Sequence, residues 1–310
     1  MIDMATVQRA YAIGGISEIA ARSCARARRI LRTRWIASLP HKLRVGVDLV
    51  KVRVRPETAD LANWRPDWKT KIIGEMLELR GGAFLDIGAN IGQTLLDYRA
   101  AERRLRYFGF EPMTKCIDQI IRLIDDNRLD DCLLIPVALS NKNSVSKLYR
   151  HRQDATDLEA TLIDCLRPER HTRFDLVPCY RFDDIWSDLG FEEKIGVIKI
   201  DVEGAELMVL DGMTLTINSQ RPWILCEVLD RDAAADADSH KQRNERLFDL
   251  LQSHGYKIMR LEKSHDQLRI CGLTPIDGFP TRAYGTASHG ECDYLFIPQD
   301  QLDASRRLVS

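Results

Sequence analysis

The sequence FLDIGANIGQ (residues 84–93) connects an apolar strand to the start of a helix through a turn that holds two glycines four positions apart. Glycine lets a backbone approach a ligand closely, and the free N–H groups at the start of a helix can hold a carboxylate or a phosphate. Glu111 ends the next predicted strand 23 residues after Gly88, near the offset of about 20 residues at which such an acid meets ribose hydroxyls. We therefore predict a nucleotide-type cofactor at this turn.

The residues around the two glycines distinguish between cofactor classes. Dinucleotide-binding turns follow the pattern G-x-G-x-x-G, whereas Asn90 stands here in place of the middle glycine. The carboxylate of Asp86 would repel a pyrophosphate but attract the ammonium and sulfonium groups of S-adenosylmethionine, whose own carboxylate suits a helix N-terminus. We predict S-adenosylmethionine as the cofactor. A nicotinamide-dependent oxidoreductase and a non-catalytic binding protein that retains the fold are the alternatives.

Short apolar runs alternate with helical patterns from residue 66 onward, which is typical of parallel strands joined by crossover helices. The expected strands cover residues 83–87, 106–110, 133–139, 196–200, 223–229, 256–261 and 293–297. Together they predict an α/β, doubly wound sheet of seven strands. Residues 141–190 and 262–292 are polar and are expected to be irregular, as binding loops or lids often are.

A second informative stretch, IKIDVEGAE (residues 198–206), leads from a buried strand into three acidic residues. Ligands of open α/β sheets bind at the carboxyl ends of the strands, where Asp201 is expected to lie. A carboxylate there can accept a proton from a reacting hydroxyl, so we take Asp201 as the first candidate for a catalytic base and Glu203 as the second. Glu206 falls in a first helical turn, where an acid stabilises the helix dipole without a catalytic role.

Seven runs of the sequence together resemble the FkbM family of S-adenosylmethionine-dependent methyltransferases. These runs are FLDIGANIGQ (84–93), FEP (110–112), VALS (137–140), IKIDVEGAELMVLDGM (198–213), RPWILCEV (221–228), HGY (254–256) and YLFIP (294–298). The resemblance covers residues 66–298 and implies the Rossmann-like, class I methyltransferase sheet, with strand order 3-2-1-4-5-7-6 and the last strand antiparallel. It implies a methyltransferase domain over residues 66–300, between a basic, partly helical N-terminal extension (1–65) and a C-terminal tail (301–310).

The same resemblance assigns roles to individual residues. The methionyl end of the cofactor would be held by Asp86, Gly88, Ala89, Asn90, Gly92 and Gln93. Glu111 with Pro112 would bind the ribose, Ala138 and Ser140 would lie beside the adenine, and Asp201 and Glu203 would face the transferred methyl group. Family members are usually O-methyltransferases that act on hydroxyls of sugars, glycolipids or polyketide-type small molecules, so an acceptor of this kind is expected.

Composition excludes several other kinds of protein. The chain has 45 basic and 46 acidic residues, a net charge of −1, which gives no electrostatic case for a nucleic acid partner. No apolar run approaches the roughly 18 residues of a membrane-spanning helix. The eight cysteines show no metal-binding spacing, which is typical of a cytoplasmic protein with reduced thiols. Asp201 and Glu227 follow adjacent strands and could hold a divalent cation, but no third oxygen ligand is identified, so no metal ligands are assigned.

The N-terminal arm differs from the rest of the chain. Residues 1–45 contain nine basic and two acidic residues, a net charge of +7. Apolar residues from Ile16 to Trp35 recur every three or four positions, which predicts an amphipathic helix surrounded by arginines. Such a helix can contact an anionic membrane surface, act as an organelle presequence, or pack on the catalytic domain. Peripheral membrane contact through this arm is therefore one expectation among three.

Overall fold

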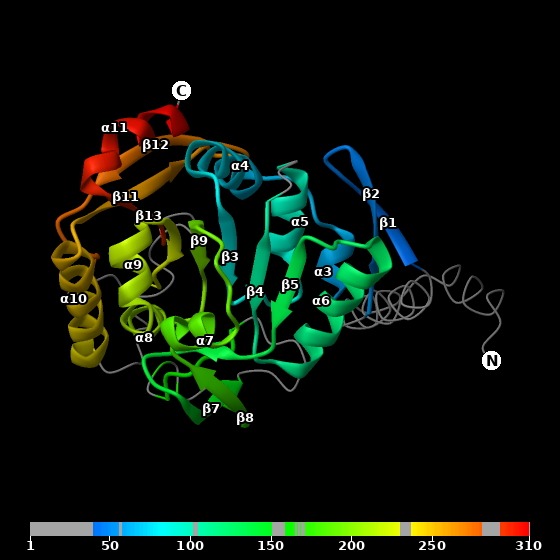
Figure 1. The fold of residues 1–310 in the computed structure, drawn as a ribbon, viewed down its shortest axis with the longest axis horizontal. Coiled ribbons are helices and arrows are strands. Elements are labelled where there is room, and N and C mark those ends of the chain that lie inside the picture. The colour runs from blue at the N-terminus through cyan, green and yellow to red at the C-terminus, as the bar shows by residue number, and fades with distance from the viewer. Residues whose placement is uncertain are drawn as a thin grey trace, which may run out of the picture.

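The computed structural model describes residues 40–55, 58–101, 105–150, 159–164, 166, 168, 171–229, 237–280 and 292–309. Within these residues the central sheet has eight strands, in the order β12-β11-β13-β10-β9-β3-β4-β5 (Figure 1). The strands are β3 (Ala83–Ile87), β4 (Tyr107–Phe110), β5 (Cys132–Ile135), β9 (Ile195–Ile200), β10 (Trp223–Glu227), β11 (Tyr256–Lys263), β12 (Ile270–Pro275) and β13 (Asp293–Pro298).

Seven of these strands have the predicted order and directions. β3 pairs in parallel with both β4 and β9, while β13 runs antiparallel to both β10 and β11. This confirms the class I methyltransferase sheet. The eighth strand, β12, corrects the expectation that residues 262–292 are irregular throughout. It pairs antiparallel with β11 after a tight turn, in which the carboxylate of Asp266 accepts hydrogen bonds from the Ser264 hydroxyl and from the Leu268 N–H.

The strand predicted over residues 133–139 is split into two. β5 ends at Ile135, and β6 (Ala138–Leu139) belongs to a second, three-stranded sheet with β8 (Arg173–Tyr180) and β7 (Ser144–Arg150). Pro136 stands at the break, where its missing N–H cannot continue the ladder. The second sheet, followed by α7 (Phe182–Asp188), lies in the region expected to be irregular, so that expectation is corrected as well.

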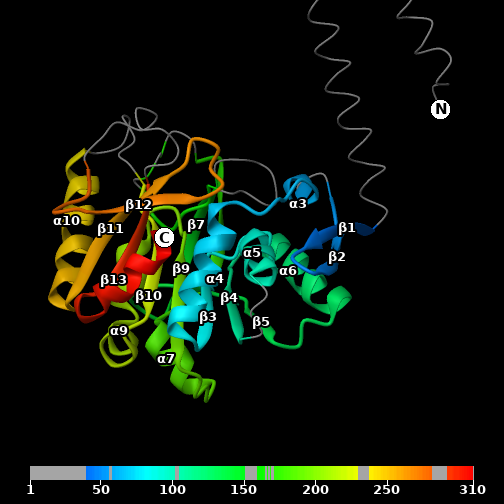
Figure 2. The same ribbon diagram turned by 90° about the horizontal axis from the view of Figure 1, so that it is seen from above.

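Helices cover both faces of the central sheet. Alternate side chains of β3 enter different cores: Phe84 packs in one and Leu85 in the other, as expected for parallel strands buried on both faces. The first core is completed by α4 (Trp68–Arg80), α5 (Gln93–Ala100) and α6 (Thr114–Asn127). The second is completed by α7, α8 (Glu206–Asp211), α9 (Thr214–Gln220) and α10 (Ala237–Ser253). Figure 2 shows α10 beside β11, at the opposite end of the sheet from α6.

The described part of the N-terminal extension is a hairpin followed by one short helix. β1 (Pro40–Val45) and β2 (Asp48–Arg53) pair antiparallel, and α3 spans Ala59–Ala62. The hairpin contacts α6 through an ion pair between Arg53 and Asp126 and through a hydrogen bond from Gln119 Nε2 to the carbonyl of Arg53, at 3.0 Å. The amphipathic helix predicted over residues 16–35 lies outside the described residues.

The C-terminal residues also join the first core. α11 (Leu302–Ser305) is followed by a short 3₁₀ turn, η4 (Arg306–Val309), whose Leu308 is buried. None of the helices in the described part of the chain has the length and apolarity needed to cross a membrane.

Candidate active site

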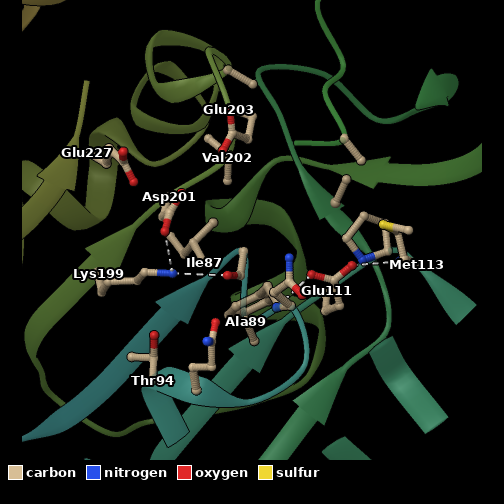
Figure 3. A pocket seen from close by; sticks show the side chains of 18 of the residues that line it. Ile87, Ala89, Thr94, Glu111, Met113, Lys199, Asp201, Val202, Glu203 and Glu227 are labelled. Carbon is tan, nitrogen blue, oxygen red and sulfur yellow. Dashed lines mark hydrogen bonds and ion pairs between the residues drawn. The ribbon is translucent and has the colours of Figure 1, made fainter. Parts of the chain in front are cut away.

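A cavity of about 420 Å³ opens where β3, β4, β9 and β10 end (Figure 3). This is the edge at which open α/β sheets bind ligands, and the volume suits a ligand of nucleoside size. Its walls come from the turn after β3, from residues 110–113 and 137–139, from residues 201–203, and from residues 60–69 ahead of and within the start of α4. Leu148, Ala160 and Leu162 supply an apolar wall.

The turn after β3 is shaped by two left-handed residues. Gly88 has φ +81°, and a Cβ added there would lie 1.9 Å from the carbonyl oxygen of Asp201, so only glycine fits. Asn90 has φ +47°, a conformation that asparagine tolerates better than most residues. The N–H groups of Gly88 and Ala89 both donate to the carbonyl of Phe110, which fixes the turn against β4.

Glu111 is fixed at the edge of the cavity by two backbone donors. Its Oε2 accepts from the N–H of Asn90 at 2.9 Å, and its Oε1 accepts from the N–H of Met113 at 2.8 Å. Burial raises the pKa of Glu111 to about 7, although both hydrogen bonds favour the charged form. Each oxygen retains a free lone pair, so the group can also accept hydrogen bonds from the hydroxyls of a ligand.

Lys199 connects the turn to Asp201 in a buried charge network. Its Nζ donates to the carbonyl of Gly88 at 3.0 Å and lies 3.3 Å from Asp86 Oδ1 and 3.5 Å from Asp201 Oδ2. Tyr107 donates to the other oxygen of Asp86 at 2.6 Å. Burial disfavours the charge of Lys199, but the two carboxylates outweigh it and raise the pKa of the amine.

Asp201 and Glu227 lie side by side on the cavity floor, at the ends of the paired strands β9 and β10. Burial favours the neutral form of Asp201, yet Lys199 and Lys69 lower its pKa below the usual value. The negative charge of Asp201, together with burial and with Asp293, raises the pKa of Glu227 to about 9. The two shifts run in opposite directions and favour a pair that holds one proton at neutral pH. Among the described residues, no cluster of three or more His, Cys, Asp or Glu is placed to hold a metal ion.

Most of the predicted site residues line this cavity. They are Gly88, Ala89, Asn90, Gln93, Glu111, Pro112, Ala138, Asp201 and Glu203. Glu203 has a left-handed backbone, with φ +51°, and its carbonyl accepts from the hydroxyl of Thr161 at 2.6 Å. Glu206, assigned no catalytic role, is not among the residues that line the cavity, and its carboxylate accepts from the N–H of Gly204.

Three predicted residues do not line the cavity. The side chain of Asp86 is fully buried and is linked to the site by its ion pair with Lys199. Gly92 is the N-cap residue of α5 and packs against Leu123 and Ile120 of α6. Ser140 is buried behind the cavity, where its N–H donates to the carbonyl of Tyr180.

Sequence reasoning missed the wall formed by residues 60–69. Trp64 Nε1 and Thr70 Oγ1 both donate to Asp97 Oδ1, at 3.1 and 2.7 Å, which ties this segment to α5. Burial raises the pKa of Asp97 to about 7. Lys69, at the start of α4, reaches the cavity near Asp201. Lys199 was also missed, although its place two residues before Asp201 on a buried strand was a usable signal.

The strand order, with the cavity at the carboxyl edge, is that of the Rossmann-like, class I methyltransferase fold. Residues 86–258, more than half of the chain, match the model of the methyltransferase FkbM domain, and the chain belongs to this family.

Relatives of several kinds share parts of this sequence. The 2-O-methyltransferase NoeI of Sinorhizobium fredii is 29% identical over 174 residues, covering 52% of this chain and 68% of NoeI. The AMB antimetabolite synthetase AmbE of Pseudomonas aeruginosa is 27% identical over 208 residues, covering 56% of this chain but 9% of AmbE. The crystal structure of a methyltransferase FkbM from Methylobacillus flagellatus is similar with a TM-score of 0.38 and 17% identity, over 61% of this chain and 42% of that one.

Proposed function

We propose that this protein is an S-adenosylmethionine-dependent O-methyltransferase that methylates a hydroxyl of a sugar, glycolipid or polyketide-type small molecule. The observation that carries the proposal is that Glu111 and Asp201 line one cavity on either side of a turn that only glycine can form at position 88. The similarity to a 2-O-methyltransferase supports oxygen as the methylated atom.

The residues of the cavity fit this cofactor. The turn at Gly88–Asn90 with Gln93 would hold the methionyl end, Glu111 would accept hydrogen bonds from the ribose hydroxyls, and Val137 to Leu139 would contact the adenine. The bound cofactor supplies an activated methyl group on a sulfonium ion. Asp86 would act indirectly, by holding Lys199 against the carbonyl of Gly88.

The residues of the protein would position the cofactor and the acceptor and would remove the proton of the acceptor hydroxyl. Methyl transfer neutralises a sulfonium cation, so orienting the reacting atoms matters most, and good orientation can contribute about 7–11 kcal/mol. Asp201 would accept the proton of the acceptor hydroxyl, a contribution of typically ~10²–10⁴-fold. Its low pKa suits this task, because the hydroxyl proton becomes strongly acidic as the new C–O bond forms. Lys199 would be a positioning residue that keeps Asp201 charged.

We also propose a cytoplasmic enzyme with a small-molecule acceptor and no nucleic acid partner, as its balanced charge suggests. Membrane contact through the basic N-terminal arm stays a prediction.

Calorimetric titration distinguishes the proposed cofactor from the alternatives. We expect S-adenosylmethionine and S-adenosylhomocysteine to bind one site per chain, and NADH to give no heat of binding. Binding of NADH with no response to S-adenosylmethionine would support the oxidoreductase instead. Binding of S-adenosylmethionine without methyl transfer to any acceptor would support the non-catalytic alternative.

A further inference from the structure

Acidic residues follow one another across three adjacent strands at this edge of the sheet. Asp201 directly follows β9, Glu227 ends the adjacent β10, and Asp293 begins β13, where it is paired with Glu227 in the antiparallel register. Glu203, in the loop after β9, adds a further charge that acts on Glu227. The carboxyl group of Glu227 is thus bordered by acids on the strands at both sides.

The lysines around Glu227 form their ion pairs with its acidic neighbours. Lys199 pairs with Asp86 and Asp201, and Lys263 pairs with Asp293. Lys199 and Lys69, the latter from α4, both act electrostatically on Glu227. Each also acts on Asp201, and Lys69 acts on Asp293 as well. Glu227 and Asp201 directly follow the paired Cys226 and Ile200 on adjacent parallel strands, and both line the cavity. Two neighbouring carboxyl groups disfavour the ionised form of one of them.

We propose that Glu227 is a further catalytic residue: the Asp201–Glu227 pair stores one proton in the free protein, releases it when the positively charged cofactor binds, and takes up the proton of the acceptor hydroxyl during transfer. The proposal rests on the proposed function, because it takes S-adenosylmethionine as the ligand of the cavity. A permanent positive charge beside two adjacent carboxyl groups favours the ionised form of both. The direction of the pKa shift at Glu227 agrees, since the free protein keeps this group protonated at neutral pH.

The reaction balances with this proton store. The hydroxyl oxygen forms a bond to the methyl carbon, the carbon–sulfur bond breaks, and its electron pair stays on the sulfur, which becomes neutral. The hydroxyl proton passes to Asp201 and is shared with Glu227. The product S-adenosylhomocysteine lacks the sulfonium charge, so the pair keeps this proton until the next S-adenosylmethionine binds.

The test compares proton release on binding of two ligands that differ by the sulfonium methyl group. Calorimetric titrations at pH 7.5, in buffers with different ionisation enthalpies, give the number of protons released on binding. Both ligands have the same ribose, so any contribution from Glu111 cancels in the difference. After correction for the titration of each ligand's own amine, we expect S-adenosylmethionine to release about 0.5–1 more proton than S-adenosylhomocysteine.

Two variants complete the design. In Glu227→Gln the difference between the ligands should disappear, while Glu206→Gln, which alters a nearby buried acid outside the cavity, should keep it. Should Glu227→Gln fail to fold, the wild-type protein provides a second test of the proton store. The ratio of the two affinities must then shift in favour of S-adenosylmethionine as the pH rises from 6.5 to 8.5. Equal proton release by both ligands in the wild type overturns the proton store. Failure of both ligands to bind overturns the proposed function itself.

Discussion

The carbonyl oxygen of Asp201 lies so close to Gly88 that a Cβ at position 88 would be 1.9 Å from it. The backbone of Gly88 is therefore packed directly on the residue that we assign as the base. Lys199 reinforces this contact by donating to the carbonyl of Gly88 while it pairs with Asp201. The cofactor turn and the candidate base are thus one rigid unit.

Gly88→Ala is expected to destabilise the fold and to weaken cofactor binding. A left-handed alanine costs about 1–2 kcal/mol, and the steric conflict with Asp201 adds about 1–3 kcal/mol. Gly190→Ala is the matched control, since Gly190 also has a positive φ, +65°, but nothing lies within 4 Å of an added Cβ. Urea denaturation should show the larger loss for Gly88→Ala. Equal losses in the two variants would show that the close contact between Gly88 and Asp201 does not contribute to the free energy of unfolding.

Lys199→Met should raise the pKa of Asp201 and destabilise the protein. Removing one partner of a buried ion pair typically costs about 3–5 kcal/mol, because the remaining charges lose their compensation. Carbon-13 NMR of the aspartate side chains measures the pKa directly. Adding Asp86→Asn to Lys199→Met should restore part of the stability. An unchanged titration of Asp201 would contradict the role of Lys199 as its positioning residue.

Glu111 is expected to make cofactor affinity depend on pH. Its pKa is about 7 in the free protein, and hydrogen bonds from ribose hydroxyls favour the ionised form. Binding of S-adenosylhomocysteine should therefore weaken as the pH falls below 7, by up to about tenfold per pH unit. Glu111→Ala should lose about 1.5–3 kcal/mol of binding free energy. A flat pH profile for the wild type between pH 5 and 8 would argue against the ribose assignment.

The raised pKa of Asp97 predicts that the wall formed by residues 60–69 is more stable in acid than at neutral pH. This is the opposite of the pH dependence expected for cofactor binding. Its pKa is raised from 3.8 to about 7 in the folded protein. A raised carboxyl pKa stabilises the docked state in acid, and this contribution is lost as the pH rises through the folded value. Hydrogen exchange of the segment, corrected for intrinsic rates, should show more frequent opening at pH 7.5 than at pH 5. Asp97→Asn should remove the dependence, and its persistence there would exclude Asp97 as the cause.

The parts of the site that follow single strands could be predicted from the sequence. Gly88, Glu111 and Asp201 each stand at a strand end, and the topology brings parallel strand ends to one edge. Asp86 shows the limit of this reasoning. The sequence shows an acidic residue at position 86 but not where its side chain points. In the structure this carboxylate pairs with Lys199 in the interior instead of facing a ligand.

Other features depend on tertiary contacts that no local pattern reports. Trp64 is held in the cavity wall because its indole N–H donates to Asp97 on α5. The strand β12 is short and follows a polar turn, so its pairing with β11 left little periodic signal. The break at Pro136, in contrast, was readable from the missing N–H of proline.

The most direct test of the central claim is transfer of a labelled methyl group. The protein is incubated with S-adenosylmethionine carrying a deuterated methyl group and with a small-molecule extract, and the products are analysed by mass spectrometry. We predict that wild-type protein places the labelled methyl on a hydroxyl oxygen, and that Asp201→Asn retains cofactor binding by calorimetry but transfers ~10²–10⁴-fold more slowly. Undiminished transfer by Asp201→Asn, or a label found on carbon or nitrogen instead of oxygen, would contradict the account.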